Sequence, residues 1–217
     1  MKILAVEFSS EQRSVAVLAD GRVCGAATET ATRTTRAFGL VSQALAGAGF
    51  EREQVECLAI GLGPGSYTGI RSAIALAQGW QLARPVRLLG VGSVECLAAG
   101  AQAQGWFGKV SFVIDAQREE LYLAGYDIGL EDFQEVEPLR LVSLDEARLK
   151  SSAGEIMAGP EVNRWFGEGR VLFPGAAMLG RLASRREDFV AGEKLEPIYL
   201  RETNFVKAPP PLVFPID

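Results

Sequence analysis

The chain has 217 residues, of which 48% are hydrophobic and 23% are charged, and its formal net charge is −5. This length allows one large domain or two small ones, and the apolar share is sufficient for a hydrophobic core. The acidic balance argues against a protein that binds nucleic acid on its own, because such binding needs clustered lysine and arginine.

The first half of the chain predicts three strands, a helix, a strand, a helix and a strand, followed by a further helix. The opening strand, KILAVEF, is an apolar run with Glu7 near its end, and DGR at 20–22 is a hairpin signal between the second and third strands. The strands are expected at 2–8, 14–19, 23–29, 55–63 and 85–92, and the helices at 37–48, 68–83 and 93–104.

The second half repeats this order. Its first strand, KVSFVIDA, also ends near a carboxylate, Asp115, before a tight turn, and Ser143 is the expected N-cap of a helix. The strands are expected at 109–116, 121–127, 135–142 and 155–160, and the helices at 143–150 and 175–188. The repeat predicts a duplicated α/β fold: two tandem ribonuclease-H-like (actin-like ATPase, ASKHA) subdomains, each a mixed five-stranded sheet with flanking helices.

We expect an N-terminal subdomain at 1–106, a smaller C-terminal subdomain at 107–207 and a flexible Pro-rich tail at 208–217. Within the second subdomain, the segment PIYLRETNF is expected to dock on the first half through Tyr199 and Leu200.

The three cysteines are widely spaced, which indicates reduced, buried thiols in a cytoplasmic protein. The first residues read as a strand rather than a signal peptide. No apolar run approaches the ~20 residues that span a membrane, so no membrane partner is expected.

The sequence contains no histidine. This excludes Ser-His-Asp catalysis, Cys-His catalysis and HExxH zinc sites. Because the cysteines are also dispersed, a transition-metal site is not expected. We therefore predict no catalytic residues and no metal ligands.

The stretch GLGPGSYTGIRSAIALAQGW at 61–80 raises the question of a phosphate-binding loop. It is not a Walker A sequence, because no lysine occurs between Lys2 and Lys109, and its glycines do not fit GxGxxG. Two interpretations stay open. One is a tight strand-to-helix connection that needs positive φ angles; the other is a helix N-terminus, capped by Ser66 or Thr68, that holds an anion. The weak candidates for a cofactor site are Glu7, Ser9, Gly63, Gly65 and Ser66.

The helices predicted at 37–48 and 68–83 have unusual faces. In the first, a core stripe is expected at Phe38, Val41, Leu45 and Ala48. Short side chains gather on another face, at Gly39, Ser42, Gln43 and Ala46. That face either lets another helix approach closely or is simply solvated. The second helix is apolar almost all round, which indicates burial on all sides or burial by a partner.

Four segments occur in a familiar order: ILAVEFSSEQRSVAVL, the stretch at 61–80, VIDAQREELYLAGY and PIYLRETNFVK. They resemble the TsaB family, also called YeaZ, and span nearly the whole chain. The most specific part is the block GPGS-[FY]-TG-[ILV]-R, which is matched by Gly63, Pro64, Gly65, Ser66, Tyr67, Thr68, Gly69 and Arg71. The resemblance implies two actin-like subdomains, in agreement with the repeat.

The resemblance also implies a non-catalytic scaffold subunit. TsaB proteins are bacterial partners of TsaD, the ATP-dependent transferase that, with the ATPase TsaE, installs threonylcarbamoyl on adenosine 37 of ANN-decoding tRNAs. TsaB lacks the catalytic metal site of this paralogue, whose HxxxH helix has no counterpart in a chain without histidine. No cofactor is expected on the chain alone, ATP or ADP at the partner interface stays open, and tRNA is expected only as part of the complex.

The resemblance places partner binding on the first two helices, with a homodimer through the same helices when TsaD is absent. The residues expected at this interface are Arg33, Arg36, Gly39, Ser42, Gln43, Ala46, Ile70, Arg71, Ile74 and Ala77. Two positions depart from the family pattern. The first strand ends in Glu7-Phe8-Ser9 instead of Asp-Thr-Ser or Asp-Thr-Ala, which argues against an intact phosphate site, and Arg33 stands where the family often has histidine.

Two other functions remain as alternatives. One is an independent ATP-binding phosphotransferase or ATPase of the actin-like class, with Glu7, Asp115 and the glycine loop at its site. The other is a protease. It is the weaker alternative, because no histidine is present to activate Ser9 or Ser66.

Overall fold

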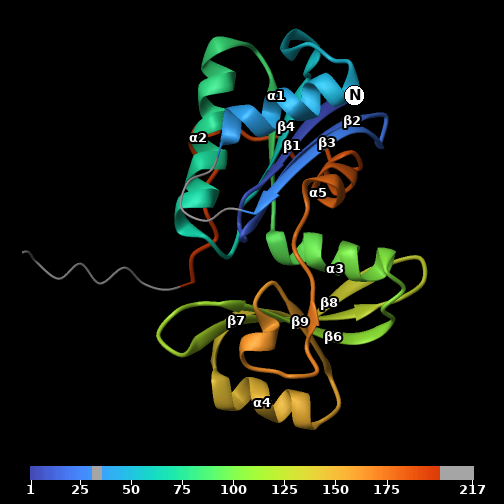
Figure 1. The fold of residues 1–217 in the computed structure, drawn as a ribbon, viewed down its shortest axis with the longest axis vertical. Helices are drawn as coiled ribbons and strands as arrows, with labels where there is room; N and C mark the ends of the chain where they lie inside the picture. Colours follow the sequence, from blue (N-terminus) through green and yellow to red (C-terminus); the bar gives the residue numbers. More distant parts are fainter. Residues whose placement is uncertain (31–35, 201–217) are drawn as a thin grey trace, which may run out of the picture.

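The computed structural model describes residues 1–30 and 36–200, which form two five-stranded mixed sheets arranged along the long axis of the molecule (Figure 1). The strand order is β3-β2-β1-β4-β5 in the first sheet and β10-β9-β6-β7-β8 in the second. The first sheet consists of β1 Lys2–Glu7, β2 Gln12–Ala19, β3 Arg22–Thr30, β4 Cys57–Gly61 and β5 Arg87–Val91. The second consists of β6 Gly108–Asp115, β7 Glu120–Ile128, β8 Phe133–Ser143, β9 Ile156–Gly159 and β10 Arg170–Val171.

Both sheets have the same pairing pattern. β1 pairs antiparallel with β2 and parallel with β4, and β6 has the same relation to β7 and β9. Each sheet is therefore an antiparallel meander of three strands continued by two parallel strands. An α-helix separates the two parallel strands of the first sheet, and a short 3-10 turn separates those of the second. This is ribonuclease-H-like, actin-like connectivity used twice, so the predicted duplicated α/β fold is confirmed.

The helices of the described residues follow the apolar patterns of the sequence. They are α1 Ala37–Ala48, α2 Tyr67–Ala83, α3 Ser93–Ala103, α4 Leu144–Ser152 and α5 Ala176–Ala183, with short 3-10 turns η1 Arg52–Gln54, η2 Val162–Arg164 and η3 Gly192–Lys194. The bounds of α1 coincide with the prediction. The strand β10 was not predicted, because two residues are too few to show a periodicity.

Local sequence explains the first sheet. β1 is buried from Ile3 onward because it is the central strand, so it reads as a continuous apolar run. The predicted hairpin between β2 and β3 is confirmed. It turns at Asp20 and Gly21, whose φ angles of 49° and 76° match the left-handed turn that this dipeptide favours.

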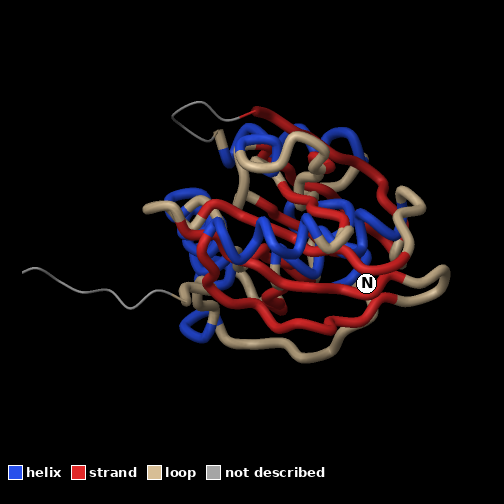
Figure 2. The backbone as a smooth tube through the Cα atoms, turned by 90° about the horizontal axis from the view of Figure 1, so that it is seen from below, coloured by secondary structure: helices blue, strands red, loops and turns tan. Residues whose placement is uncertain are grey.

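The helices α3 and α5 exchange between the two halves (Figure 1). α5 follows the second sheet in the chain but packs on the first sheet, where Leu179 joins Ile3 and Leu18 in one core cluster. Seen from below, helices lie packed among the strands of the molecule (Figure 2). α3 follows the first sheet's strands but adds Leu97 to the core of the second sheet. The two helices also contact each other. The predicted boundary near residue 106 follows the order of the chain, whereas the packing exchanges helices across it.

The cysteines divide into two groups. Cys57 and Cys96 are buried, and burial raises the pKa of the Cys57 thiol to about 11. Cys24 is exposed, so the prediction of a buried thiol is wrong there; it lies on β3, the edge strand of the first sheet, where most side chains face solvent. Among the described residues, no helix is both long and apolar enough to cross a membrane.

Candidate functional site

Residues 62–66, the glycine loop, connect β4 to α2 and pack against the chain just after β1. Gly63 and Gly65 have φ angles of 88° and 143°, which favour glycine. A side chain at Gly65 would overlap the Ser9 carbonyl, and one at Gly69 would overlap the Phe8 carbonyl. These glycines are therefore required by backbone conformation and by close backbone approach.

The loop also uses its own amide groups. Gly63 N donates to Ser93 Oγ at 3.2 Å, and Ser66 N donates to the Ser9 carbonyl at 2.6 Å. Gly69 N donates to Ser66 Oγ at 3.3 Å, which makes Ser66 the N-cap of α2. Because these donors are satisfied within the protein, the geometry favours a structural strand-to-helix connection over a phosphate cradle.

Glu7 is placed in the interior and not in an open site. Its Oε1 accepts from Ser9 N at 2.8 Å, and its Oε2 accepts from Ser93 Oγ at 2.9 Å. A side chain at Gly61 would overlap the carboxylate. Burial raises the pKa of Glu7, and the hydrogen bonds from Ser9 and Ser93 oppose that rise. Glu7 therefore joins β1, the glycine loop and the start of α3, which argues against a catalytic or metal-binding role.

The inner face of α2 lies in the core of the same chain. Ile70, Ile74 and Ala77 are buried in the cluster under α1 and α2. Their prediction as partner contacts is therefore corrected: the sheet that α2 covers buries them already. Arg71 is exposed, and its guanidinium lies 4.6 Å from the centre of the Tyr67 ring.

The C-terminal end of the described chain docks on the glycine loop. The rings of Tyr67 and Tyr199 stack with centroids 5.5 Å apart, and Ile198 N donates to the Leu62 carbonyl at 2.8 Å. The predicted docking of this segment through Tyr199 is confirmed for residues 197–200, whereas the rest of the segment lies outside the described residues. Leu200 remains 40% exposed, so it is not a buried anchor.

The outer face of α1 is exposed, and its side chains are short except for that of Gln43. Its members are Gly39, Ser42, Gln43 and Ala46. Arg36, just before the helix, is also exposed and forms a 3.4 Å ion pair with Glu29. Arg33 lies outside the described residues. The sequence prediction of one solvent-accessible, small-residue face on α1 therefore agrees with the structure, whereas contact with a partner is a separate question.

An apolar hollow of about 390 Å³ lies between α1 and α2. Phe38 is 73% exposed at this hollow, so its prediction as a core residue is wrong. Its position on the helix suits the core stripe, but α2 leaves this space open beside it. The other apolar side chains that line the hollow are Val41, Ala75, Leu76, Trp80 and Ala83. We call the outer face of α1 together with this hollow the helical face.

A second hollow, the inter-sheet cleft, has a volume of about 560 Å³ and lies where the two sheets approach each other. Asp115 in this cleft accepts from Gln117 N at 2.8 Å and from Arg164 Nη1 at 2.6 Å. Gln117 begins a run of three positive φ angles in the turn after β6. Asp115 thus caps the turn after β6 through its side chain. Among the candidate residues, Ser9, Gly65 and Ser66 line this cleft.

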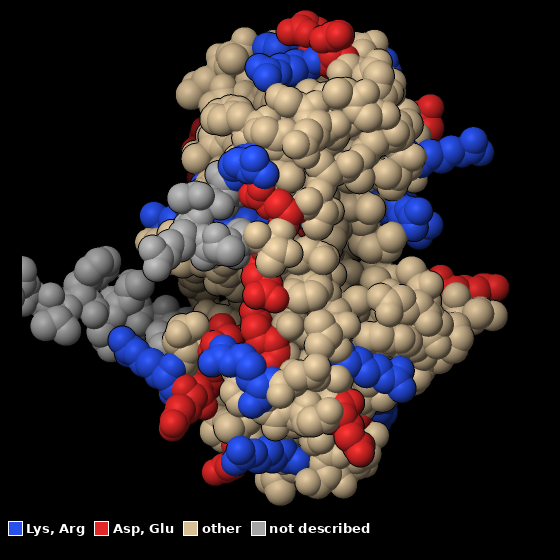
Figure 3. All heavy atoms as spheres, in the orientation of Figure 1, with Lys and Arg blue, Asp and Glu red and all other residues tan. Residues whose placement is uncertain are grey.

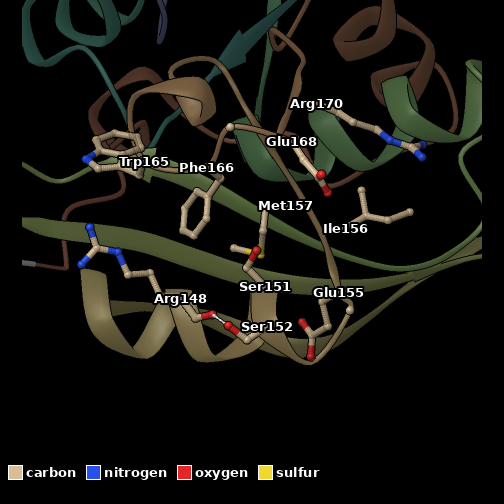
Figure 4. A pocket seen from close by; sticks show the side chains of 13 residues that line it. Arg148, Ser151, Ser152, Glu155, Ile156, Met157, Trp165, Phe166, Glu168 and Arg170 are labelled. Carbon is tan, nitrogen blue, oxygen red and sulfur yellow. Dashed lines mark hydrogen bonds between the residues drawn. The ribbon is translucent and has the colours of Figure 1, made fainter.

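A third hollow, of about 630 Å³, lies between α4 and the turn η2 (Figure 4). Trp165 and Phe166 line one side of it, and Arg148 and Ser152 of α4 line the other. Ser152 Oγ donates to the Arg148 carbonyl at 3.0 Å, as the figure marks. Glu155 is also engaged, because it accepts from Ser111 Oγ at 2.6 Å. The polar groups named here already have partners, so this groove offers little unused chemistry.

On the face of the described residues that Figure 3 shows, lysine and arginine side chains are interspersed with aspartate and glutamate. Among the described residues, no group of three or more histidine, cysteine, aspartate or glutamate side chains is arranged to hold a metal ion.

The chain is similar to proteins of tRNA modification. A family model described as "TsaD: tRNA N6-adenosine threonylcarbamoyltransferase" matches residues 28–200. The "tRNA threonylcarbamoyladenosine biosynthesis protein TsaB" of Escherichia coli K12 is 32% identical over 220 residues, covering 93% of this chain and 95% of the relative. The protein of the same name from Haemophilus influenzae is 32% identical over 126 residues, covering 57% and 53%.

A solved structure agrees with these relatives. YeaZ from Pseudomonas aeruginosa superposes with a TM-score of 0.78 at 26% identity, and the match covers 92% of this chain and 99% of that one. The fold, the glycine loop and the near full-length match to the E. coli relative agree in indicating one family. The chain belongs to the TsaB (YeaZ) family of tRNA threonylcarbamoyladenosine biosynthesis proteins.

Proposed function

We propose that this chain is a non-catalytic docking subunit, which binds a TsaD-type transferase through the helical face and thereby supports transfer of threonylcarbamoyl to adenosine 37 of tRNA in the cytoplasm. The observation that carries the proposal is the helical face itself: short exposed side chains on α1 beside an apolar hollow with an exposed phenylalanine. A TsaE-type ATPase and tRNA would join only in the assembled complex.

The physical case for docking rests on shape and on exposed apolar surface. The side chains of Gly39, Ser42 and Ala46 are short, so a partner helix can approach the α1 backbone closely at these positions. Phe38 and the hollow expose apolar surface, and the removal of such surface from water favours association. Charged side chains rim the hollow, as is usual at protein interfaces: Arg52, Glu53 and Arg84.

The case against independent catalysis rests on the interior placement of the candidate groups. The chain has no histidine, Glu7 is fully buried, and three amides of the glycine loop have partners within the protein. We therefore propose no cofactor on the chain alone. ATP or ADP would bind only where the partner completes the site.

Ser42→Arg tests the docking surface. Ser42 is exposed, so the free subunit accommodates the new side chain with the loss of one 3.4 Å hydrogen bond from Arg52 Nη2 to Ser42 Oγ, whereas a helix that approaches α1 is obstructed. We expect the affinity for the TsaD-type partner to fall about tenfold or more, which corresponds to ~1.4 kcal/mol or more, as measured by calorimetry. Synthesis of the modified base in the reconstituted system should fall in parallel. Phe38→Ser should also weaken binding, because it removes an exposed aromatic side chain from the interface.

Ser152→Arg is the matched control, since Ser152 is an exposed helical serine on α4 and lies in the other half of the molecule. It should leave binding and activity at the level of the unmodified chain. If Ser42→Arg and Phe38→Ser bind the partner normally, the helical face is not the interface. A homodimer through the same face would be disrupted by the same two variants in sedimentation experiments.

Calorimetry with ATP separates this proposal from an independent ATP-binding enzyme. The isolated chain should show no saturable binding of Mg-ATP at micromolar concentration. Saturable binding that is lost in Glu7→Ala, while the variant keeps its circular dichroism spectrum, would favour the enzyme instead.

A further inference from the structure

The apolar hollow of the helical face has the lining of a groove for an extended apolar peptide. Phe38 and Val41 of α1 line one side, and Leu76 and Trp80 of α2 line the other. Phe38 is 73% exposed, so much of its ring faces solvent at the hollow. Proline-rich segments dock on aromatic-lined grooves of this kind, because their extended conformation exists before binding and packs against aromatic faces.

The charged rim distinguishes one end of the hollow from the other. Arg84 follows the last residue of α2, and its guanidinium pairs with Glu53 at 3.4 Å. Arg52, next to Glu53, donates to Ser42 Oγ at 3.4 Å and has no ion pair among the described residues. The positive charge of Arg52 is therefore uncompensated where α2 ends, and this end of the hollow favours a carboxylate.

The chain that follows Leu200 starts near the opposite end of α2. The ring of Tyr199 stacks on that of Tyr67, in the first turn of α2, with centroids 5.5 Å apart. The part of α2 that lines the hollow, from Ala75 to Ala83, begins about 12 Å further along the helix axis and ends about 24 Å further along it. An extended chain spans up to about 3.3 Å per residue, so residues 201–208 can cover this distance.

Residues 209–216, the proline-rich segment, have the composition that this hollow accepts. Their sequence is PPPLVFPI, which has no polar or charged side chain, and Asp217 follows it directly. Three consecutive prolines favour the extended polyproline conformation. The direction of the chain also fits, because a segment that runs from the first turn of α2 toward its last brings Asp217 to the end of the hollow that carries Arg52.

We propose that the proline-rich segment docks on the apolar hollow of its own chain, with its prolines and Phe214 against Phe38 and Trp80 and with Asp217 beside Arg52. A tether of this length gives an effective concentration on the order of 1 mM, so a weak contact is sufficient to cover the hollow. The segment would then compete with a partner of the helical face. This competition rests on the proposed function, whereas the docking itself does not.

Disulfide formation in the full chain tests the docking. Ala83→Cys and Leu212→Cys are combined in a Cys24→Ser background, which removes the exposed native thiol. Ala83 is exposed and lines the hollow, and a disulfide needs Cβ atoms about 4 Å apart. With oxidised glutathione as the oxidant, this pair should cross-link within one chain at least about tenfold faster than the control pair Ser72→Cys and Leu212→Cys.

Ser72 is the matched control position, because it is also exposed on α2 and does not line the hollow. It lies closer to Tyr199 along the helix, so a segment that does not dock would reach it at least as often as Ala83. Equal cross-linking rates at the two positions would overturn the inference. Cross-links that join two chains, seen as dimers in non-reducing electrophoresis, would overturn it as well and would identify a second copy as the occupant.

Phe38→Ser and Phe214→Ser remove the two aromatic contacts separately. Each should slow cross-linking of the cysteine pair at 83 and 212 to about the rate of the control pair. Phe107→Ser is the matched control substitution, because Phe107 is also exposed and lies at the start of the second half of the chain. It should leave the rate unchanged. An unchanged rate in a folded Phe38→Ser variant, verified by thermal unfolding, would show that the segment does not bind at the hollow.

Calorimetry with the TsaD-type partner tests the competition. Phe214→Ser in the otherwise unmodified chain should raise the affinity at least about twofold, because the apparent affinity is reduced by the fraction of chains whose hollow is covered. An unchanged affinity together with fast cross-linking at Ala83 would leave the docking in place and show that the partner binds elsewhere. Failure of the inference and failure of the proposed function therefore give different results.

Discussion

At the scale of single residues, Glu7 shows how a position that is polar in the sequence becomes part of the core. From the sequence alone, Glu7 is a weak candidate for a cofactor site. The structure turns the carboxylate to Ser9 N and Ser93 Oγ and covers it completely. Position along the strand was therefore predictable, but the direction of the side chain depends on α3, a remote helix.

Glu7→Gln should change how stability depends on pH. The pKa of Glu7 is raised in the folded chain above the ordinary 4.5. At pH values between 4.5 and the pKa in the folded chain, the folded state therefore holds a proton that the unfolded state has released. The stabilisation from this proton is present at low pH and is lost as pH rises. The free energy of unfolding of the native chain should therefore fall relative to the variant, by up to about 1.4 kcal/mol per pH unit.

Urea unfolding of both proteins near pH 5 and near pH 8 measures this difference. Glu131→Gln serves as the control, since Glu131 is exposed and should show a pH profile parallel to that of the native chain. Parallel profiles for Glu7→Gln as well would mean that the raised pKa of Glu7 does not contribute to stability.

At the scale of elements, α1 and α2 mark the limit of prediction from periodicity. The bounds of α1 follow from its local pattern, and the apolar character of α2 correctly indicated a helix with a large buried area. Which side chains face outward was only partly predictable: Phe38 fits the core stripe and is exposed, whereas Ile70 and Ile74 seemed available to a partner and are buried. The difference arises because the width of the gap between α1 and α2 depends on how both helices pack on the sheet beneath them, which the pattern of either helix alone does not show.

Two glycines of α2 should respond oppositely to alanine. A methyl group at Gly69 would overlap the Phe8 carbonyl, so Gly69→Ala should destabilise the chain by roughly 1–3 kcal/mol through overpacking. A methyl group at Gly79 meets no atom within 4 Å, so Gly79→Ala should stabilise the chain by about 0.5–1 kcal/mol, because alanine is the better helix former. Chemical denaturation measures both; a neutral Gly69→Ala would contradict the tight packing of loop on strand.

At the scale of the whole molecule, the duplication was visible in the sequence and the exchange of helices was not. Strand order follows from the repeated succession of elements and the rule that connections are short. The apolar stripe of α5 shows that a sheet covers it, but the same stripe would fit either sheet. The choice depends on shape, for example on Gly180, where any side chain would overlap Leu18 of β2.

This exchange predicts that residues 1–106 do not fold as an independent unit. Without α5, the apolar face of the first sheet that carries Ile3 and Leu18 is exposed to water. The fragment should bind a hydrophobic dye and unfold without a cooperative transition. A fusion in which a Gly/Ser linker joins 1–106 directly to 173–200 restores α5. Neither polypeptide contains the second sheet, so both leave the face of α3 that carries Leu97 uncovered. If only the fusion shows a cooperative thermal transition, the difference is due to α5. The same cooperative transition in the fragment 1–106 would show that the first sheet is stable without its borrowed helix.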